Sequence, residues 1–222
     1  MNFTILQTEG IQLEGKLAGS TVSVTYTSML YEQPADNQCF LGLWQNSRIP
    51  FGLGSIVTKQ ISNNQRIGSA SFPIHATNVS YIVGWGAGSE AGKSDPNYKS
   101  IGASLIFTPG TGSGGITPGV AYQCQIQPID VSYDSVLVKF TTLPGNTPKS
   151  NENWIGLWLN DTLDFNGGYL QKWDVSSSSP EDTQGLEVTD QIKAGTIYTL
   201  AYATGNRKSD IVARCTFRTA DY

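Results

Sequence analysis

The sequence predicts an all-β chain of two β-sandwiches in tandem, and three observations support this. FLGLWQN at residues 40–46 returns as WIGLWLN at residues 154–160. Apolar residues alternate with polar ones at Val22, Val24 and Tyr26, which is the pattern of a strand with one buried face. The chain has 24 Gly and only 14% charged residues, a composition that suits strands and turns better than helices.

The repeat extends well beyond this motif. Three further pairs of segments correspond between the two halves: VSVTYT (22–27) with VLVKFT (136–141), YIVGWGAG (81–88) with YTLAYATG (198–205), and ASLIFTP (103–109) with ARCTFRT (213–219). The segments recur in the same order, with small differences in spacing that loop insertions explain. The chain therefore contains two copies of one structural unit.

PGTGSGGITPG at residues 109–119 separates the two copies. Its glycines and flanking prolines cannot continue a helix or a strand, so we expect a flexible linker there. This places a first domain at residues 1–109, a linker at 110–118 and a second domain at 119–222. Each copy, about 105 residues long, can bury a modest two-sheet core.

Each copy should hold about seven strands, at the spacing expected for a β-sandwich. Polar turn segments separate them, for example LPGNTPKSNEN at 143–153 and SSSSPED at 176–182. Trp44 and Trp158 lie within the two G-L-W motifs, where we expect a large core residue on the third strand. This arrangement predicts an immunoglobulin-like sandwich without an inter-sheet disulfide.

Residues 153–219 carry a family resemblance. NWIGLW (153–158), GYLQKW (168–173) and YTLAYATGNRKSDIVARCTF (198–217) together resemble the SKICH-type immunoglobulin-like domain, and also the sandwich domain that precedes the catalytic domain of purple acid phosphatases. Asn153 stands where those domains carry an acidic residue, and the first copy has GLGSIVTKQ in place of the middle element. The resemblance implies an interaction or localisation module and transfers no catalytic residue.

The charge balance argues against one class of partner. Lys plus Arg is 14 and Asp plus Glu is 18, so the net charge is −4 and no basic stripe is available for nucleic acid. The opening MNFTILQTEG shows neither a basic nor an apolar signal region, and no apolar run is long enough for a transmembrane helix. We expect no Sec signal peptide, which leaves a cytoplasmic location and export by another route both open.

The cysteines Cys39, Cys124 and Cys215 stand at no repeated short spacing, which argues against a zinc or redox motif. Cys124 and Cys215 would meet if they lay on the first and last strands of one domain, so a disulfide between them stays open. Buried free thiols are the favoured interpretation.

Enzyme motifs are weak throughout the chain. AGSEAGKS at 87–94 fits a relaxed phosphate loop, but Pro96 and a β-rich segment follow where such a loop needs a helix. The single histidine, His75, has no nucleophile and acid at a recognisable spacing. The acids that could form a hydrolytic pair lie in turn segments: Glu152, Asp161, Asp164, Asp174, Glu181 and Asp182. We therefore expect a protein that is not an enzyme.

A polar tripeptide recurs in the two copies. Lys93, Ser94 and Asp95 return as Lys208, Ser209 and Asp210 in the corresponding loop. Two copies that share a polar loop tip could be retaining a surface that binds a ligand. The competing interpretation is an Asx-type turn with a neighbouring lysine, which needs no ligand.

NDTLDFNGG at 160–168 groups several oxygen ligands in one turn. Asp161, Asp164 and Asn166 are the residues that would bind a metal ion, and calcium prefers such carboxylate and carbonyl oxygens. The segment lacks the spacing and the closing glutamate of a helix-flanked calcium loop, so a turn capped by its own side chains is the competing interpretation. Calcium is the only cofactor that the sequence leaves open.

Aromatic residues in or beside the loops suggest how a ligand would be held. Trp173, Tyr169 and Trp85 are the rings we nominate for ligand binding, and Tyr98 and Tyr222 also lie in or near loops. A flat ring complements the C–H face of a sugar while polar neighbours fix its orientation. The competing interpretation is that these rings complete two small cores.

Together these features predict a non-enzymatic recognition protein that binds a glycan or a protein surface on cells. Two alternatives stay open. One is a membrane-active or insecticidal-type bacterial toxin, in which RIPFGLGSIVTKQIS at 48–62 would be the inserting amphipathic β-segment. The other is a structural surface protein that assembles through its sheet edges. The oligomeric state is not predicted.

Overall fold

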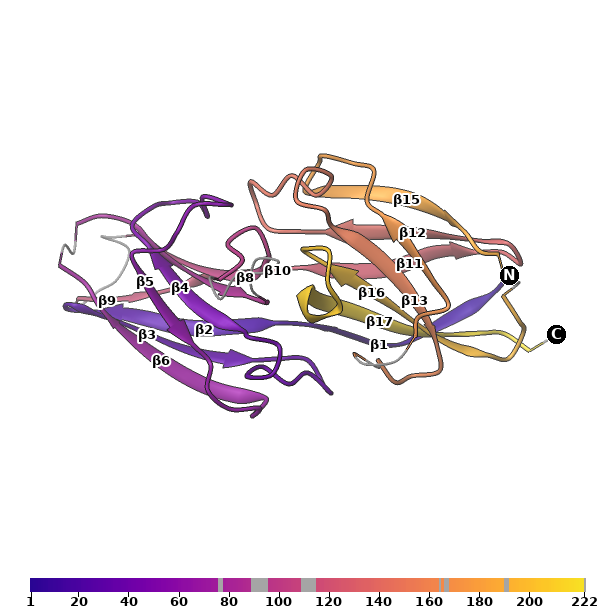
Figure 1. Cartoon of the computed structure of the whole chain (residues 1–222), viewed down its shortest axis with the longest axis horizontal. Helices are drawn as coiled ribbons and strands as arrows, with labels where there is room; N and C mark the ends of the chain where they lie inside the picture. The colour runs from indigo at the N-terminus through magenta and orange to yellow at the C-terminus, as the bar shows by residue number, and fades with distance from the viewer. Residues whose placement is uncertain are drawn as a thin grey trace. The chain divides into compact units, whose positions relative to one another are not determined.

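A computed structural model describes residues 1–75, 78–88, 96–108, 115–163, 165, 168–189 and 192–221 of the chain. Strands dominate these residues, which confirms the all-β prediction, and η2 (Lys208–Asp210) is a single turn of 3₁₀ helix. The chain forms two compact units (Figure 1). We call residues 11–123 with 143–145 the N-terminal sandwich, and residues 1–10, 124–142 and 146–222 the C-terminal sandwich.

The N-terminal sandwich has two antiparallel sheets. The first runs in the order β6 (Ile67–Pro73), β3 (Thr21–Thr27), β2 (Gln12–Ala18) and β9 (Ile116–Pro118). The second runs in the order β10 (Val120–Gln123), β8 (Ile101–Phe107), β7 (Tyr81–Gly86), β4 (Phe40–Trp44) and β5 (Val57–Gln60). Its core lies between the sheets, where Tyr26 of β3 contacts Trp85 of β7 with ring centroids 4.8 Å apart.

The C-terminal sandwich has the same plan. One sheet runs in the order β11 (Gln125–Val131), β12 (Ser135–Thr141) and β15 (Glu181–Glu187). The other runs in the order β1 (Phe3–Gly10), β17 (Ile211–Thr219), β16 (Ile197–Ala203), β13 (Trp154–Leu159) and β14 (Gln171–Asp174). Phe140 of β12 stacks on Tyr202 of β16 across the core, with ring centroids 5.4 Å apart.

The strand order is that of an immunoglobulin-like sandwich in both units. A hairpin (β2 with β3, or β11 with β12) begins one sheet, the next two strands cross to the other sheet, one strand returns, and the last two pair beside the crossing strands. The period-two pattern read from the sequence is confirmed, because Val22, Val24 and Tyr26 are buried while their neighbours in β3 are more exposed.

The tryptophans of the G-L-W motifs are buried, but Trp158 faces away from the opposite sheet. Directly paired residues share a face of a sheet, and Ile155 pairs with Tyr202, which stacks on Phe140. Ile155 therefore points into the inter-sheet core. Trp154 and Trp158, at alternate positions of β13, point to the outer face. Trp44 and Trp158 are buried, as expected for large core residues, but Trp158 packs on the outer face of its sheet, while isoleucine and leucine of the motif fill the core between the sheets.

Each sandwich is completed by a strand from the other repeat. Strand β1 begins the first repeat, yet it pairs with β17, the last strand of the second, from Phe3 with Thr219 to Gly10 with Ala213. Strand β10 begins the second repeat, yet it pairs with β8, the last strand of the first. The two strands hold equivalent positions, since each precedes the hairpin of its own repeat and lies beside the final strand of the other.

This exchange moves the unit boundaries away from the expected ones. Residues 1–10, expected in the first domain, belong to the C-terminal sandwich, and residues 119–123, expected in the second, belong to the N-terminal sandwich. The expected linker at 110–118 includes β9, which pairs with β2, while residues 109–114 lie outside the described part of the chain. Sequence similarity aligns the strands of a repeat but does not reveal which sheet each strand joins.

The segment nominated for membrane insertion, 48–62, supplies the four-residue edge strand β5 and the loop before it. Leu53 and Ile56 in this loop are 65% and 60% exposed, while the Leu53 carbonyl accepts a hydrogen bond of 3.0 Å from Trp44 Nε1. The loop therefore covers the outer face of β4. Within the residues described above, no helix is long and apolar enough to cross a membrane.

All three cysteines are free and buried, so the disulfide that the sequence left open is not formed. Cys215 lies in the middle of β17 and is fully buried. Burial raises the pKa of its thiol to about 12, because the apolar surroundings disfavour the thiolate. We therefore regard Cys215 as an inert packing residue.

Candidate binding surface

Trp154, Gly156 and Trp158 form a row along the outer face of β13. Gly156 makes the row possible, because a Cβ atom there would stand only 2.5 Å from Trp158 Cζ3 and 2.8 Å from Trp154 Cζ3. The two indole rings therefore close over the glycine, with centroids 6.2 Å apart. Both side chains are almost completely buried, so the row is a rigid base for whatever lies above it.

Tyr169 covers this row and is its exposed member. Its ring lies 6.0 Å from Trp154 and 5.9 Å from Trp158, measured between centroids, and 39% of the residue is exposed. The chain brings it there from the segment just before β14, the strand that pairs with β13. Tyr169 is thus an exposed aromatic, as the sequence predicts, and its role in binding stays a prediction.

Two lysines flank the aromatic cluster. Lys172 Nζ lies 4.9 Å from the centroid of the Trp154 ring and 3.9 Å from Asp174 Oδ1. Lys208 Nζ lies 5.6 Å from the centroid of the Tyr169 ring. Ammonium groups over aromatic faces are attracted by the ring quadrupole, which orders both side chains. The structure therefore brings together two sequence candidates, Tyr169 and Lys208, and adds Lys172.

Sequence reasoning missed Lys172 because a lone lysine between Gln171 and Trp173 has no motif of its own. The signal that could have found it is its position on the strand next to the G-L-W strand. Lys172 pairs directly with Gly156, so its side chain stands on the outer face of the sheet, beside the tryptophan row.

Lys208 is held in place by the turn that Asp210 builds. The Asp210 side chain is fully buried, and its Oδ2 accepts a hydrogen bond of 3.0 Å from the backbone N–H of Arg207. The Asp210 carbonyl accepts a further bond of 2.9 Å from the Thr204 N–H. The expectation that Asp210 meets a ligand is therefore wrong, and the Asx-type alternative describes it. Ser209 is half-buried in this turn.

The corresponding tripeptide of the first repeat, Lys93, Ser94 and Asp95, lies outside the described residues. Tyr98, just after it, lies over Trp44 with ring centroids 5.9 Å apart, as Tyr169 does over Trp158. Tyr98 is half-buried, and its hydroxyl shares a hydrogen bond of 2.8 Å with Thr58 Oγ1. The two repeats thus share a tyrosine that covers the outer-face tryptophan.

Trp85 is a core residue, which contradicts its nomination for ligand binding. It is 0% exposed and packs against Tyr26 from the opposite sheet. The reason is its place on β7, a strand in the middle of a five-stranded sheet, in which every residue is buried. A Gly-rich neighbourhood suggested a loop, but here the glycines leave room for packed side chains of other strands.

Trp173 does not contact the same residues as Tyr169. Neighbouring residues of a strand point to opposite faces, so Trp173 faces away from Lys172 and the tryptophan row. Its Nε1 donates a hydrogen bond of 3.0 Å to the Glu187 carbonyl of β15, in the opposite sheet. Trp173 is half-buried and closes one edge of the sandwich. The structure therefore does not place it with Tyr169 in one site.

The calcium prediction cannot be followed through the whole segment, because Asp164 and Asn166 lie outside the described residues. Asp161 is exposed, and its Oδ1 accepts a bond of 3.3 Å from the Thr162 hydroxyl. Among the residues that the structure describes, no group of three or more His, Cys, Asp or Glu side chains could hold a metal ion. Calcium binding at this turn stays a prediction.

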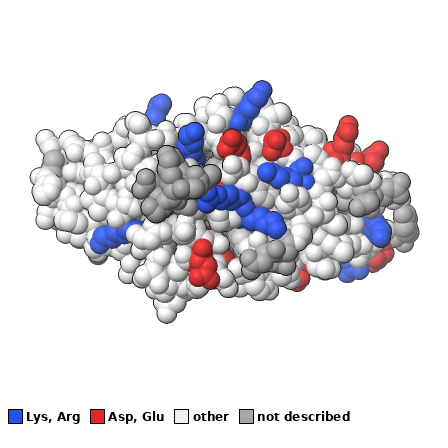
Figure 2. Space-filling view, in the orientation of Figure 1, with Lys and Arg blue, Asp and Glu red and all other residues white. Residues whose placement is uncertain are grey.

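Uncharged residues cover most of the face that Figure 2 shows. This agrees with the low share of charged residues, 14% of the chain. Long-range electrostatic steering contributes little at such a surface.

Comparisons with known proteins show likeness only among solved structures. No protein-family model matches the chain, and no curated protein matches it. A two-domain fibronectin type-III segment of chicken tenascin is 14% identical, with 93% of this chain and 98% of that chain covered and a TM-score of 0.29. The ligand-binding domain of human OSCAR is 11% identical, with 91% and 93% covered and a TM-score of 0.23. At these values the likenesses say nothing about what this chain binds.

Proposed function

We propose that this protein is a non-enzymatic recognition module that binds a glycan or a protein on a cell surface. The observation that carries the proposal is the exposed Tyr169 ring, held on a rigid base of Trp154 and Trp158 and flanked by Lys172 and Lys208. A preformed aromatic surface loses little conformational entropy on binding, which is why such residues dominate recognition sites.

Two further features support a binding role. The turn at Asp210 fixes Lys208 beside the ring, so the cation and the aromatic group are presented together. The resemblance of residues 153–219 to SKICH-type domains also implies an interaction module. A ligand that meets this surface would stack on or against Tyr169 and place an oxygen acceptor near the lysine ammonium groups.

The test is a glycan array together with binding to whole cells, measured with the full chain and with Tyr169→Ala. We expect the substitution to abolish binding and to leave the far-UV circular dichroism spectrum unchanged. Tyr122→Ala is the matched control, because Tyr122 is also 39% exposed but lies on β10 of the N-terminal sandwich. Equal binding by Tyr169→Ala and the unmodified chain would contradict the proposal.

Self-assembly is a second candidate function, and the exchanged strand β1 favours it. Strand β1 pairs with β17 in its own molecule, so it could pair in the same way with β17 of a second molecule of this protein. Light scattering across a concentration series should then show oligomers that disappear when residues 1–9 are deleted. A monomer at every concentration would remove this candidate.

A further inference from the structure

A groove opens at the edge of the N-terminal sandwich, between β5 and β6, the outermost strands of its two sheets. Its volume is about 530 Å³. The buried residues Tyr26 and Leu41 line it from the core side, and the segment that joins the two strands lines it at one end. It lies on a different unit from Tyr169, and part of its lining, residues 59–62, belongs to the segment at 48–62 nominated above for membrane insertion.

Tyr26 brings a hydroxyl group to this groove. The residue is only 4% exposed, and its hydroxyl lies against Gly68, where a Cβ atom would overlap it. No other residue in the described part of the chain forms a hydrogen bond with this hydroxyl. Burial is the main cause that raises the pKa of Tyr26, so the group stays a protonated donor. The hydroxyl itself is not enclosed, so a ligand that enters the groove can reach it.

The edge of β6 adds backbone groups to the same groove. Just beyond the two ends of β6, the Arg66 carbonyl accepts a hydrogen bond from the Ser28 N–H, and the Ile74 N–H donates to the Ser20 carbonyl, so the bonded pairs lie immediately outside β3 as well. Bonded and non-bonded positions alternate in an antiparallel pair. Ser69 and Ser71 lie between Arg66 and Ile74, at non-bonded positions of this pair. Their backbone N–H and C=O groups therefore point away from β3. Both residues line the groove.

The side chains around the groove are almost all uncharged. Gln60, Ser62 and Gln65 line it, and none of their side-chain atoms bonds to another described residue. Among the described residues of the lining Lys59 is the only charged one, and its Nζ lies over the Phe72 ring, 5.4 Å from the centroid. The groove therefore offers hydroxyl, amide and backbone groups that both donate and accept hydrogen bonds, and the part of its lining that the structure describes contains no carboxylate.

We propose that this groove binds a short neutral saccharide. A sugar hydroxyl donates and accepts at once, which matches amide, hydroxyl and backbone groups better than a charged ligand would. The Tyr26 hydroxyl is the deepest of these groups and donates to a sugar oxygen, while Gln60 and the Ser69 backbone bind hydroxyls nearer the mouth. The site is independent of the Tyr169 surface.

The experiment is a titration of the isotope-labelled full chain with maltose, lactose and chitobiose, followed by the amide resonances in nuclear magnetic resonance spectra. We expect saturable shifts of the Gly68, Ser69 and Gln60 amides with at least one of these sugars. Tyr26→Phe removes only the hydroxyl and should weaken binding about five- to tenfold, the effect of one hydrogen bond. Gln60→Ala, at an exposed position, should weaken it as well.

Tyr122→Phe is the control, since Tyr122 lies on β10 and does not line the groove. It should bind as the unmodified chain does. Unchanged affinity in both Tyr26→Phe and Gln60→Ala would overturn the proposal. The absence of saturable shifts with all three sugars would also overturn it. Shifts confined to Tyr169 and its neighbours would overturn it too, but that result would still support the proposed function.

Discussion

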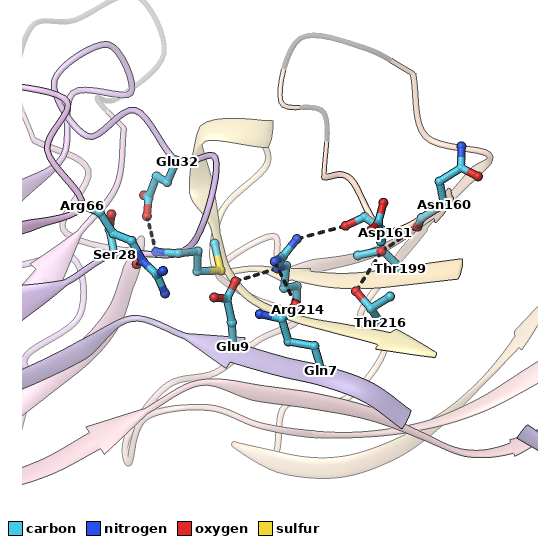
Figure 3. Close-up of polar contacts among 11 residues, drawn as sticks. Gln7, Glu9, Ser28, Glu32, Arg66, Asn160, Asp161, Thr199, Arg214 and Thr216 are labelled. Atoms are coloured by element: carbon cyan, nitrogen blue, oxygen red, sulfur yellow. Dashed lines mark hydrogen bonds and ion pairs between the residues drawn. The ribbon is translucent and has the colours of Figure 1, made fainter. Parts of the chain in front are cut away.

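Arg214 and Glu9 form a buried ion pair that joins the last strand of the second repeat to the first strand of the chain. Arg214 Nε lies 2.8 Å from Glu9 Oε2, and the two side chains are 1% and 10% exposed. Figure 3 shows the guanidinium between Glu9 and Asp161, whose carbonyl accepts a hydrogen bond of 3.2 Å from Arg214 Nη1. The pair therefore fixes β1 against β17 on the outer face of this sheet, the same face that carries Trp154 and Trp158.

Arg214→Met should destabilise the C-terminal sandwich by about 3–5 kcal/mol, because it removes the cation that lies beside the buried Glu9 carboxylate. The free energy of unfolding can be measured by urea denaturation. The double variant Arg214→Met with Glu9→Leu should recover most of the loss, since neither buried charge then remains. A single variant as stable as the unmodified chain would show that the pair contributes nothing.

Deletion of residues 1–9 should lower the melting temperature of the C-terminal sandwich and leave β17 as an exposed sheet edge. A synthetic peptide of residues 1–10 should restore the melting temperature in a concentration-dependent way, because it rebuilds the β1–β17 pairing. Calorimetry measures both effects. An unchanged transition after the deletion would mean that the paired strand contributes no stability.

Glu32 should make the N-terminal sandwich less stable as the pH rises. Burial raises the pKa of its carboxyl group to about 7, although Met29 N–H donates to it at 3.2 Å (Figure 3). The folded state therefore binds more protons than the unfolded state between pH 4.5, the usual pKa, and about 7. Stability is greatest below this window and falls across it by about 3 kcal/mol.

The measurement for Glu32 is urea denaturation at a series of pH values, for the unmodified chain and for Glu32→Gln. The amide keeps the shape of the side chain but has no charge to bury. We expect the variant to lose the slope between pH 4.5 and 7 and to exceed the unmodified chain in stability above this range. The same slope in both proteins would assign it to another group.

Gly156→Ala should displace the Trp158 ring and cost about 1–3 kcal/mol, because the new methyl group would overlap atoms packed on all sides. A change in tryptophan fluorescence should accompany the loss of stability. Gly185→Ala on β15 is the matched control, since nothing lies within 4 Å of a Cβ atom there. Two variants of equal stability would show that the row tolerates a side chain.

Local patterns were enough to predict the strands but not their partners. The alternation at Val22, Val24 and Tyr26 shows which face of the strand meets the core, and it can be recognised from residues that are close together in the sequence. The same patterns misplaced Trp85, because a ring in a Gly-rich segment reads as a loop residue until its strand is seen at the centre of a sheet.

In the candidate surface, too, the sequence indicates single residues but not which of them are in contact. Tyr169 and Lys208 were each nominated from the sequence, for different reasons and 39 positions apart in the numbering. Nothing local to either residue indicates that the Lys208 ammonium group lies over the Tyr169 ring. This contact depends on the pairing of β13 with both β14 and β16. The pairing brings the loop before β14 and the loop after β16 to the same side of the tryptophan row.

The sequence by itself determined that this protein is two copies of an all-β unit with little charge, because composition and alternation are properties of short segments. Only the tertiary structure decided that β1 completes the sheet of the second repeat and β10 that of the first. Backbone hydrogen bonds hold those strands in place, and such bonds are nearly the same for every residue type. The choice of partner is therefore made by packing and by single contacts such as Arg214 with Glu9.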